Sequence, residues 1–159
     1  MSRVRRTHST TRERRGRGQA LVEFALVAPI FFLLLFGIIE GGRFILYYEN
    51  LNNATREGAR YAIVHGSNSF CPSGPMPPGV SPKYGCYDPP GANVVQQVKA
   101  TAFGVLGSGV TVTPEWGPTG NGRDSDVTVR ATYTYQTLLP LVPLPPITIT
   151  SESRLVINN

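Results

Sequence analysis

Residues 18–39 read GQALVEFALVAPIFFLLLFGII, and the fold of this chain follows from them. Phe24 to Ile39 carry no charged side chain, and Glu23 is the one acid in the whole stretch. At about 1.5 Å of rise per residue, some twenty helical residues span the ~30 Å hydrocarbon core of a bilayer. The stretch lacks the polar face of a helix packed on a soluble protein. It therefore predicts a membrane-spanning helix.

A basic leader precedes this stretch. Residues 1–18 hold seven arginines and one acid, so the positive charge of the chain, +5 overall, is concentrated there. Beside a membrane span, arginines keep their end of the chain in the cytoplasm, which predicts a cytoplasmic leader. Binding to nucleic acid is the alternative for such a cluster, but we expect no nucleic-acid partner. Because the leader shows no apolar periodicity, we expect it to be disordered.

The helical pattern continues beyond the uncharged run. Apolar or small residues recur every three or four positions, at Phe44, Tyr48, Leu51, Ala54, Gly58 and Ala62, and a polar stripe lies opposite them. This pattern is typical of an amphipathic helix, here one that leaves the bilayer. Residues 19–64 are therefore expected to form one helix that spans the membrane in its first half. Either the C-terminal domain or a neighbouring subunit has to cover the apolar stripe.

Residues 65–159 are predicted to form a small extracytoplasmic α+β domain. A loop rich in Pro and Gly, residues 66–91, precedes a helical pattern over residues 92–106. Strand patterns, in which Val, Thr and Tyr alternate, follow at residues 110–113, 126–136 and 147–157. Residues 138–146 hold four prolines, which cannot donate to a ladder, and are expected to be a loop. The fold class is therefore α+β, with a long transmembrane helix and a small antiparallel sheet packed on the helices.

Cys71 and Cys86 both lie in the proline-rich loop. In an oxidising compartment across the membrane, two such cysteines predict a disulfide, and two free thiols are the alternative. Asn121, Asp124 and Asp126 lack the ligand spacing and the terminal Glu of a calcium loop, so they predict a turn. We expect neither a metal ion nor another cofactor in this chain.

Two parts of the chain resemble a known family. The segment Gly18-Gln-Ala-Leu-Val-Glu23-Phe resembles the processing site of class III type IV pilin-like proteins. In those proteins a prepilin peptidase cuts after Gly and leaves Glu at the fifth mature position. The wider pattern over residues 15–65, and the strand–proline loop–strand ending, are similar to the TadE-like proteins. These are minor pilins or pseudopilins of the tight-adherence (Flp-type IV) pilus.

The resemblance implies a pilin-like fold and a role in assembling a pilus used for cell adhesion. Prepilin peptidase would cut between Gly18 and Gln19. Phe24 stands where major Flp pilins commonly have Tyr, and those pilins are far shorter, so a minor component is implied. The implied partners are the membrane, other pilins or pseudopilins, the pilus assembly platform and the peptidase. The implied location is a bacterial inner membrane, with the C-terminal domain extracytoplasmic, and then the pilus itself.

Five residues are candidates for assembly contacts: Glu23, Phe24, Arg56, Glu57 and Arg60. Cleavage would create an amino group on Gln19, one helical turn from Glu23. The carboxylate can then neutralise this amine or that of an adjacent subunit, which relieves the cost of burying both. The alternative for Glu23 is solvation at the level of the headgroups. For Arg56, Glu57 and Arg60 the alternative is a solvated helix face.

A second function also fits the sequence. An uncleaved, signal-anchored envelope protein would have the same span and would use its small outer domain to bind a partner. Motifs that place a nucleophile beside a base, cradle a phosphate or bind a dinucleotide are absent from the sequence. We therefore expect the chain not to be an enzyme.

Overall fold

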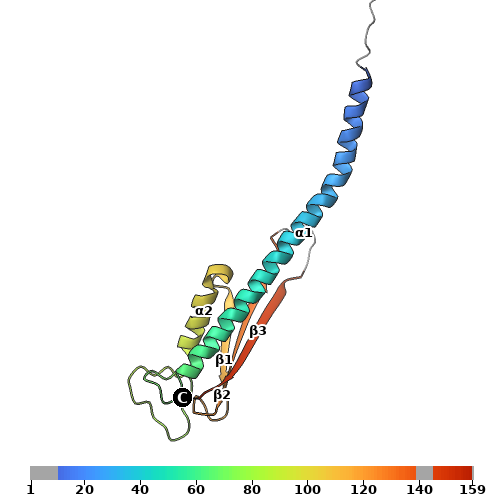
Figure 1. Ribbon diagram of the computed structural model, residues 1–159. Coiled ribbons are helices and arrows are strands. Elements are labelled where there is room, and N and C mark those ends of the chain that lie inside the picture. Colours follow the sequence, from blue (N-terminus) through green and yellow to red (C-terminus); the bar gives the residue numbers. More distant parts are fainter. Residues whose placement is uncertain (1–10, 139–144, 159) are drawn as a thin grey trace, which may run out of the picture. The chain divides into compact units, whose positions relative to one another are not determined.

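A computed structural model describes residues 11–138 and 145–158 of the chain (Figure 1). Two helices come first, α1 (Thr11–Val64) and α2 (Ala92–Leu106). Three strands follow, β1 (Val110–Trp116), β2 (Asp126–Tyr135) and β3 (Ile147–Val156). The chain divides into two compact units, an N-terminal unit, Met1–Gly41, and a C-terminal unit, Gly42–Asn159. The elements confirm the predicted α+β class, with a long apolar N-terminal helix and an antiparallel sheet.

Helix α1 begins earlier than the sequence predicted. Its first residue is Thr11, so residues 11–18, which were expected to be disordered, are helical. The prediction was wrong because it looked only for apolar periodicity. Arg and Glu are good helix formers, and an existing helix lengthens without the cost of a new nucleus. Residues 1–10 lie outside the described part of the chain.

The apolar part of α1 has the dimensions of a membrane span. The stretch Gly18–Val64 is long and apolar enough to cross a bilayer, by length and composition. Its large apolar side chains between Leu21 and Ile39, apart from half-buried Phe36, are from 39% to 73% exposed. Pro29 lies inside the helix, where it removes one backbone hydrogen bond, as is tolerated in membrane helices.

The sheet has the order β1-β2-β3, and both strand pairs are antiparallel. Ala131 at the centre of β2 pairs with Val112 of β1 and with Ser151 of β3. β1 continues to Trp116, beyond the predicted end at residue 113. Pro114 is accommodated because β1 is an edge strand, where a missing N–H donor need not break a ladder bond. Leu138, Pro145 and Pro146 lie outside the strands, and residues 139–144 are not described.

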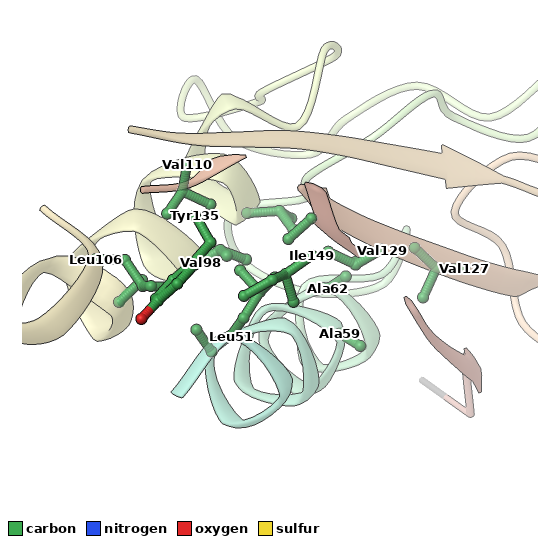
Figure 2. Packing of buried hydrophobic residues seen from close by; sticks show 14 of the residues in the cluster. Leu51, Ala59, Ala62, Val98, Leu106, Val110, Val127, Val129, Tyr135 and Ile149 are labelled. Carbon is green, nitrogen blue, oxygen red and sulfur yellow. The ribbon is translucent and has the colours of Figure 1, made fainter. Parts of the chain in front are cut away.

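The core lies between the inner face of the sheet and the two helices of the C-terminal unit (Figure 2). Leu51 of α1, Val98 of α2 and Val129 of β2 are completely buried. Burying a side chain of this size stabilises the folded state by about 1.5–3 kcal/mol. Inward positions of β2 follow the predicted alternation and are filled by Val127, Val129, Ala131 and Tyr135. The sheet thus covers the apolar stripe of α1 within the C-terminal unit.

The outer face of the sheet is polar and meets solvent. Thr111, Thr132 and Thr150 form one row across the three strands. Arg130 donates to Glu152 on the neighbouring strand, with Nη2 and Oε2 2.8 Å apart. Both side chains are about half-exposed, so solvent screens this ion pair and it contributes little to stability. Only one face of the sheet is therefore available to the core.

A disulfide between Cys71 and Cys86 closes part of the loop that joins α1 to α2, and this confirms the predicted pairing. Asp88, two residues beyond, holds the loop to the start of α2. Its Oδ1 accepts from the N–H of Ala92 at 3.0 Å, and its Oδ2 accepts from the N–H of Asn93 at 2.8 Å. These bonds satisfy two of the donors that a helix leaves unpaired at its N-terminus.

The same loop packs against the region between β1 and β2. Buried Asn121 donates from Nδ2 to the carbonyl of Ser73 at 3.1 Å. The Trp116 ring lies against Gly74 and Gly91, whose φ angles are +97° and +70°. Two reasons require glycine at both positions. A Cβ there would meet the indole, and a positive φ disfavours other residues.

Gly58 is where α1 and α2 come closest to each other. A Cβ at Gly58 would overlap the buried Val98 side chain, whereas a Cβ at Gly104 of α2 would meet nothing within 4 Å. We expect Gly58→Ala to lower the free energy of unfolding by about 1–3 kcal/mol through overpacking. The matched Gly104→Ala should raise it by roughly 0.5–1 kcal/mol, since Gly is a poor helix former. Unfolding of the full chain in detergent micelles measures both, and equal effects would contradict this packing.

Loss of the disulfide should destabilise the C-terminal unit. Cys71 and Cys86 are 15 positions apart, and closing a loop of that size stabilises by about 3 kcal/mol in the chain-entropy model. The double variant Cys71→Ser/Cys86→Ser should lose about that free energy of unfolding. Lys83, inside the closed loop, should also become a faster trypsin site. Unchanged stability and unchanged cleavage at Lys83 would show that the bridge does not constrain this loop.

Candidate processing and assembly site

The predicted processing site lies on α1 in the N-terminal unit. Gly18, Gln19 and Glu23 are all exposed on the helix. Gly18 has no close neighbour, since a Cβ built on it would meet nothing within 4 Å. Glycine inside a helix costs about 0.5–1 kcal/mol relative to Ala. Packing within the described chain therefore does not require a glycine at this position.

Gln19 and Glu23 occupy the same side of α1. They are four residues apart, and together with Gly18, Val22 and Leu26 they line one shallow surface depression. At this spacing the backbone nitrogen of Gln19 and the Glu23 carboxylate are one helical turn apart. The arrangement can place a carboxylate beside an amino group if the chain begins at Gln19.

The apolar side chains that follow Glu23 on α1 are exposed in the part of the chain that the structure describes. Phe24 is 68% exposed, and Leu26, Ile30 and Leu33 are exposed to a similar degree. Exposed apolar surface of this size marks contact with a membrane or with another protein. Phe24 is therefore available for contact with lipid or with a neighbouring helix.

The other three candidate contacts lie in the C-terminal unit. Arg56 and Arg60 are exposed, and Glu57 is half-buried, on the part of α1 that packs against the sheet through its opposite side. They belong to a different compact unit from Gly18 and Glu23, so they are not part of one site with the processing residues. Their position fits either a solvated helix face or contact with a partner.

An aromatic cluster that the sequence analysis missed lies at the start of the C-terminal unit. The Arg43 guanidinium carbon lies 5.6 Å from the ring centre of Tyr47 and 5.7 Å from that of Tyr135. Tyr47 also stacks on Tyr133 at 5.6 Å, and Phe44 meets Tyr135 edge-to-face at 5.4 Å. The four-residue spacing of Arg43 and Tyr47 was the available signal, because it places them on one side of a helix.

Burial raises the pKa of the Tyr133 hydroxyl in this cluster. The neighbouring Tyr47 adds to the rise, and the positive charge of Arg43 opposes it. The Tyr133 hydroxyl therefore stays protonated at neutral pH. Among the residues that the structure describes, no group of three or more His, Cys, Asp or Glu side chains is placed to hold a metal ion.

Comparisons with known proteins bear on the N-terminal half of the chain. A family model described as TadE-like protein matches residues 18–60. No curated protein and no solved structure matches the chain. The matched segment begins at Gly18 and contains the apolar span and all five candidate assembly residues. The resemblance inferred from the sequence is therefore confirmed over residues 18–60, where the chain matches the model of the TadE-like family.

Proposed function

We propose that this chain is a minor pilin or pseudopilin that takes part in assembling a tight-adherence pilus. The observation that carries the proposal is the TadE-like segment, which starts at Gly18 and continues through a helix whose apolar side chains the chain leaves exposed. Neighbouring helices in a fibre would cover this surface after the subunit leaves the membrane. Lipid would cover it beforehand.

The topology follows from charge and from the disulfide. The arginines of residues 1–18 favour a cytoplasmic N-terminus by the positive-inside rule. The C-terminal unit is then extracytoplasmic, where the Cys71–Cys86 disulfide is stable. Such a chain resides in the bacterial inner membrane until it enters a pilus.

Processing would turn Gly18 into the last residue of a removed leader. Glycine leaves the backbone next to the cut unobstructed, and the chain itself gains nothing from it in packing. The new amine on Gln19 would then lie beside Glu23. An amine and a carboxylate that neutralise each other lower the cost of burying both among apolar helices.

The role is structural, and we propose no catalysis by this chain. Its partners would be other pilins or pseudopilins, the assembly platform and the prepilin peptidase. Phe24 would contribute apolar contact, and Arg56, Glu57 and Arg60 would contribute contacts on the outer half of α1.

An uncleaved anchor is the second candidate, and one observation favours it. α1 runs without a break from Thr11 through the Gly18–Gln19 bond, whereas a peptidase needs an accessible, locally unfolded segment. In this case the C-terminal unit would bind a partner at the envelope and would not enter a fibre.

The N-terminus of the protein separates these two functions. In cells with an active prepilin peptidase, we expect intact-mass measurement of the membrane-extracted chain to show a start at Gln19. Gly18→Leu should block the cut, because the added side chain obstructs the backbone at the bond. The control Gly37→Leu makes the same change where a Cβ also meets nothing, and it should still be cleaved. A wild-type chain that retains its leader would support the uncleaved anchor.

Removing the Glu23 charge should impair assembly and leave processing intact. Glu23→Gln leaves the Gln19 amine without its partner, and an unpaired buried charge costs about 3–5 kcal/mol. We therefore expect at least a tenfold loss of the protein from sheared pili, quantified by immunoblot against the membrane fraction. Glu49→Gln, on the exposed side of α1, is the matched control. Equal incorporation of both variants would refute the pairing.

A further inference from the structure

Charged residues are unevenly distributed along the sheet. Residues 131–151, the end of β2 through most of β3, contain no charged side chain. Residues 100–114, which join the second half of α2 to β1, contain none either. On the β2–β3 hairpin, the Arg130–Glu152 pair flanks the charge-free stretch. The charged side chains of the sheet lie at this pair or farther toward the Asp126 end of β2. One end of the C-terminal unit is therefore free of charge in its sheet and in the turn before it.

The two charge-free stretches meet in space. Val110 pairs with Tyr133, and Tyr135 pairs with Ile147, so the turn after α2 adjoins the end of the hairpin. A Cβ at Gly109 would lie 3.2 Å from the Tyr133 ring. We name this surface the uncharged end, and it comprises Gly107–Gly109, half-buried Tyr133, Leu138, Pro145, Pro146 and Ile147. Leu138 is 60% exposed and Ile147 is 40% exposed on it.

The uncharged end lies beside the part of α1 that follows the apolar span. Phe44 and Tyr47 contact Tyr135, and Phe44 comes five residues after Ile39. α1 is helical here, so these five residues rise about 8 Å. The headgroup region adds some 5–8 Å to each side of the hydrocarbon core. If α1 spans a bilayer, Phe44 and its partners on the sheet are therefore at the level of the headgroups.

The composition of this surface fits a lipid interface. Tyr is enriched at membrane–water boundaries because its ring is apolar and its hydroxyl is polar. Exposed Leu138 and Ile147 supply apolar contact, and Pro145 and Pro146 have no N–H that would have to be satisfied. Arg43, between Tyr47 and Tyr135, supplies a cation at the depth of the lipid phosphates. The charged side chains of α1 at this level are Glu40 and Arg43, and no other follows before Glu49.

We propose that the uncharged end rests on the headgroup region of the membrane that α1 spans. The chain then has two attachments to the bilayer, the span itself and a lateral contact made by the hairpin and the turn after α2. The lateral contact fixes the tilt and rotation of the C-terminal unit at the membrane. The inference depends on α1 crossing the bilayer, and it is independent of cleavage at Gly18.

Lipid quenching of a fluorophore tests this contact. The full chain is reconstituted in vesicles of phosphatidylcholine with phosphatidylglycerol, and Leu138→Cys is labelled with an environment-sensitive dye without reductant, so that the native disulfide stays closed. Arg123→Cys, exposed between β1 and β2 at the opposite end of the hairpin from Leu138, is the matched control. We expect a blue-shifted emission at 138 that spin-labelled lipid quenches strongly, and a water-like, unquenched emission at 123.

Two results would overturn the proposal. One is equal quenching at 138 and 123, which would mean that the surface does not touch lipid. The other is a blue shift of the dye at position 138 that grows with the protein-to-lipid ratio while spin-labelled lipid does not quench the dye. This result would assign the surface to contact with a second copy of the chain.

A charge placed on the surface provides an independent check. With the dye on Ser108→Cys in the turn after α2, Leu138→Asp should markedly reduce quenching by lipid, because the carboxylate resists entry into the interface. Thr113→Asp, on the exposed face of β1, should leave the signal unchanged. If Leu138→Asp leaves the lipid quenching of the dye at position 108 unchanged, the result counts against the lipid contact. The N-terminal mass of each variant shows separately whether processing occurs.

Discussion

The apolar surface of α1 between Leu21 and Ile39 is the constraint on which the rest of this structure depends. The residues after α1 form one small domain. They pack against the second half of the helix and bury its apolar stripe, whereas the side chains of the first half stay exposed. About twenty residues of apolar helix therefore need a cover from outside, and lipid or other apolar helices are the chemically suitable ones. Membrane anchoring follows directly from this, and assembly with other helices is the proposed consequence.

A single helix thus serves two environments, and its sequence changes where the environment changes. From Phe24 to Ile39 the helix is apolar on all sides, as lipid allows. Beyond Arg43 it becomes amphipathic, and small residues such as Gly58 let α2 and the sheet approach it closely. The aromatic cluster around Arg43 occupies the transition.

The structure and the sequence agree where a periodic pattern carries the information. The three strands, the second helix and the inward positions of β2 follow from alternation or from three-to-four-residue spacing, since the side-chain period is a property of each element alone. The leader was misjudged for the same reason. Its helical start at Thr11 depends on propensity and on continuity with the span, and neither of these produces an apolar period. The length of β1 was also underestimated, because Pro114 is acceptable only on an edge strand, and edge position is not visible in the sequence.

By itself, the sequence determined the membrane-compatible span, the α+β class and the TadE-like segment, and it offered each of the two cysteines only one possible partner in the chain. Each of these follows from local composition or from a choice between very few residues. Only the tertiary structure decided that Asn121 donates to the carbonyl of Ser73, that Trp116 requires Gly74 and Gly91, and that Arg43 meets Tyr135 of β2. These contacts join residues that are distant in the chain and leave no periodic trace. Their physical cause is the fit of particular side chains once the sheet has closed over the helices.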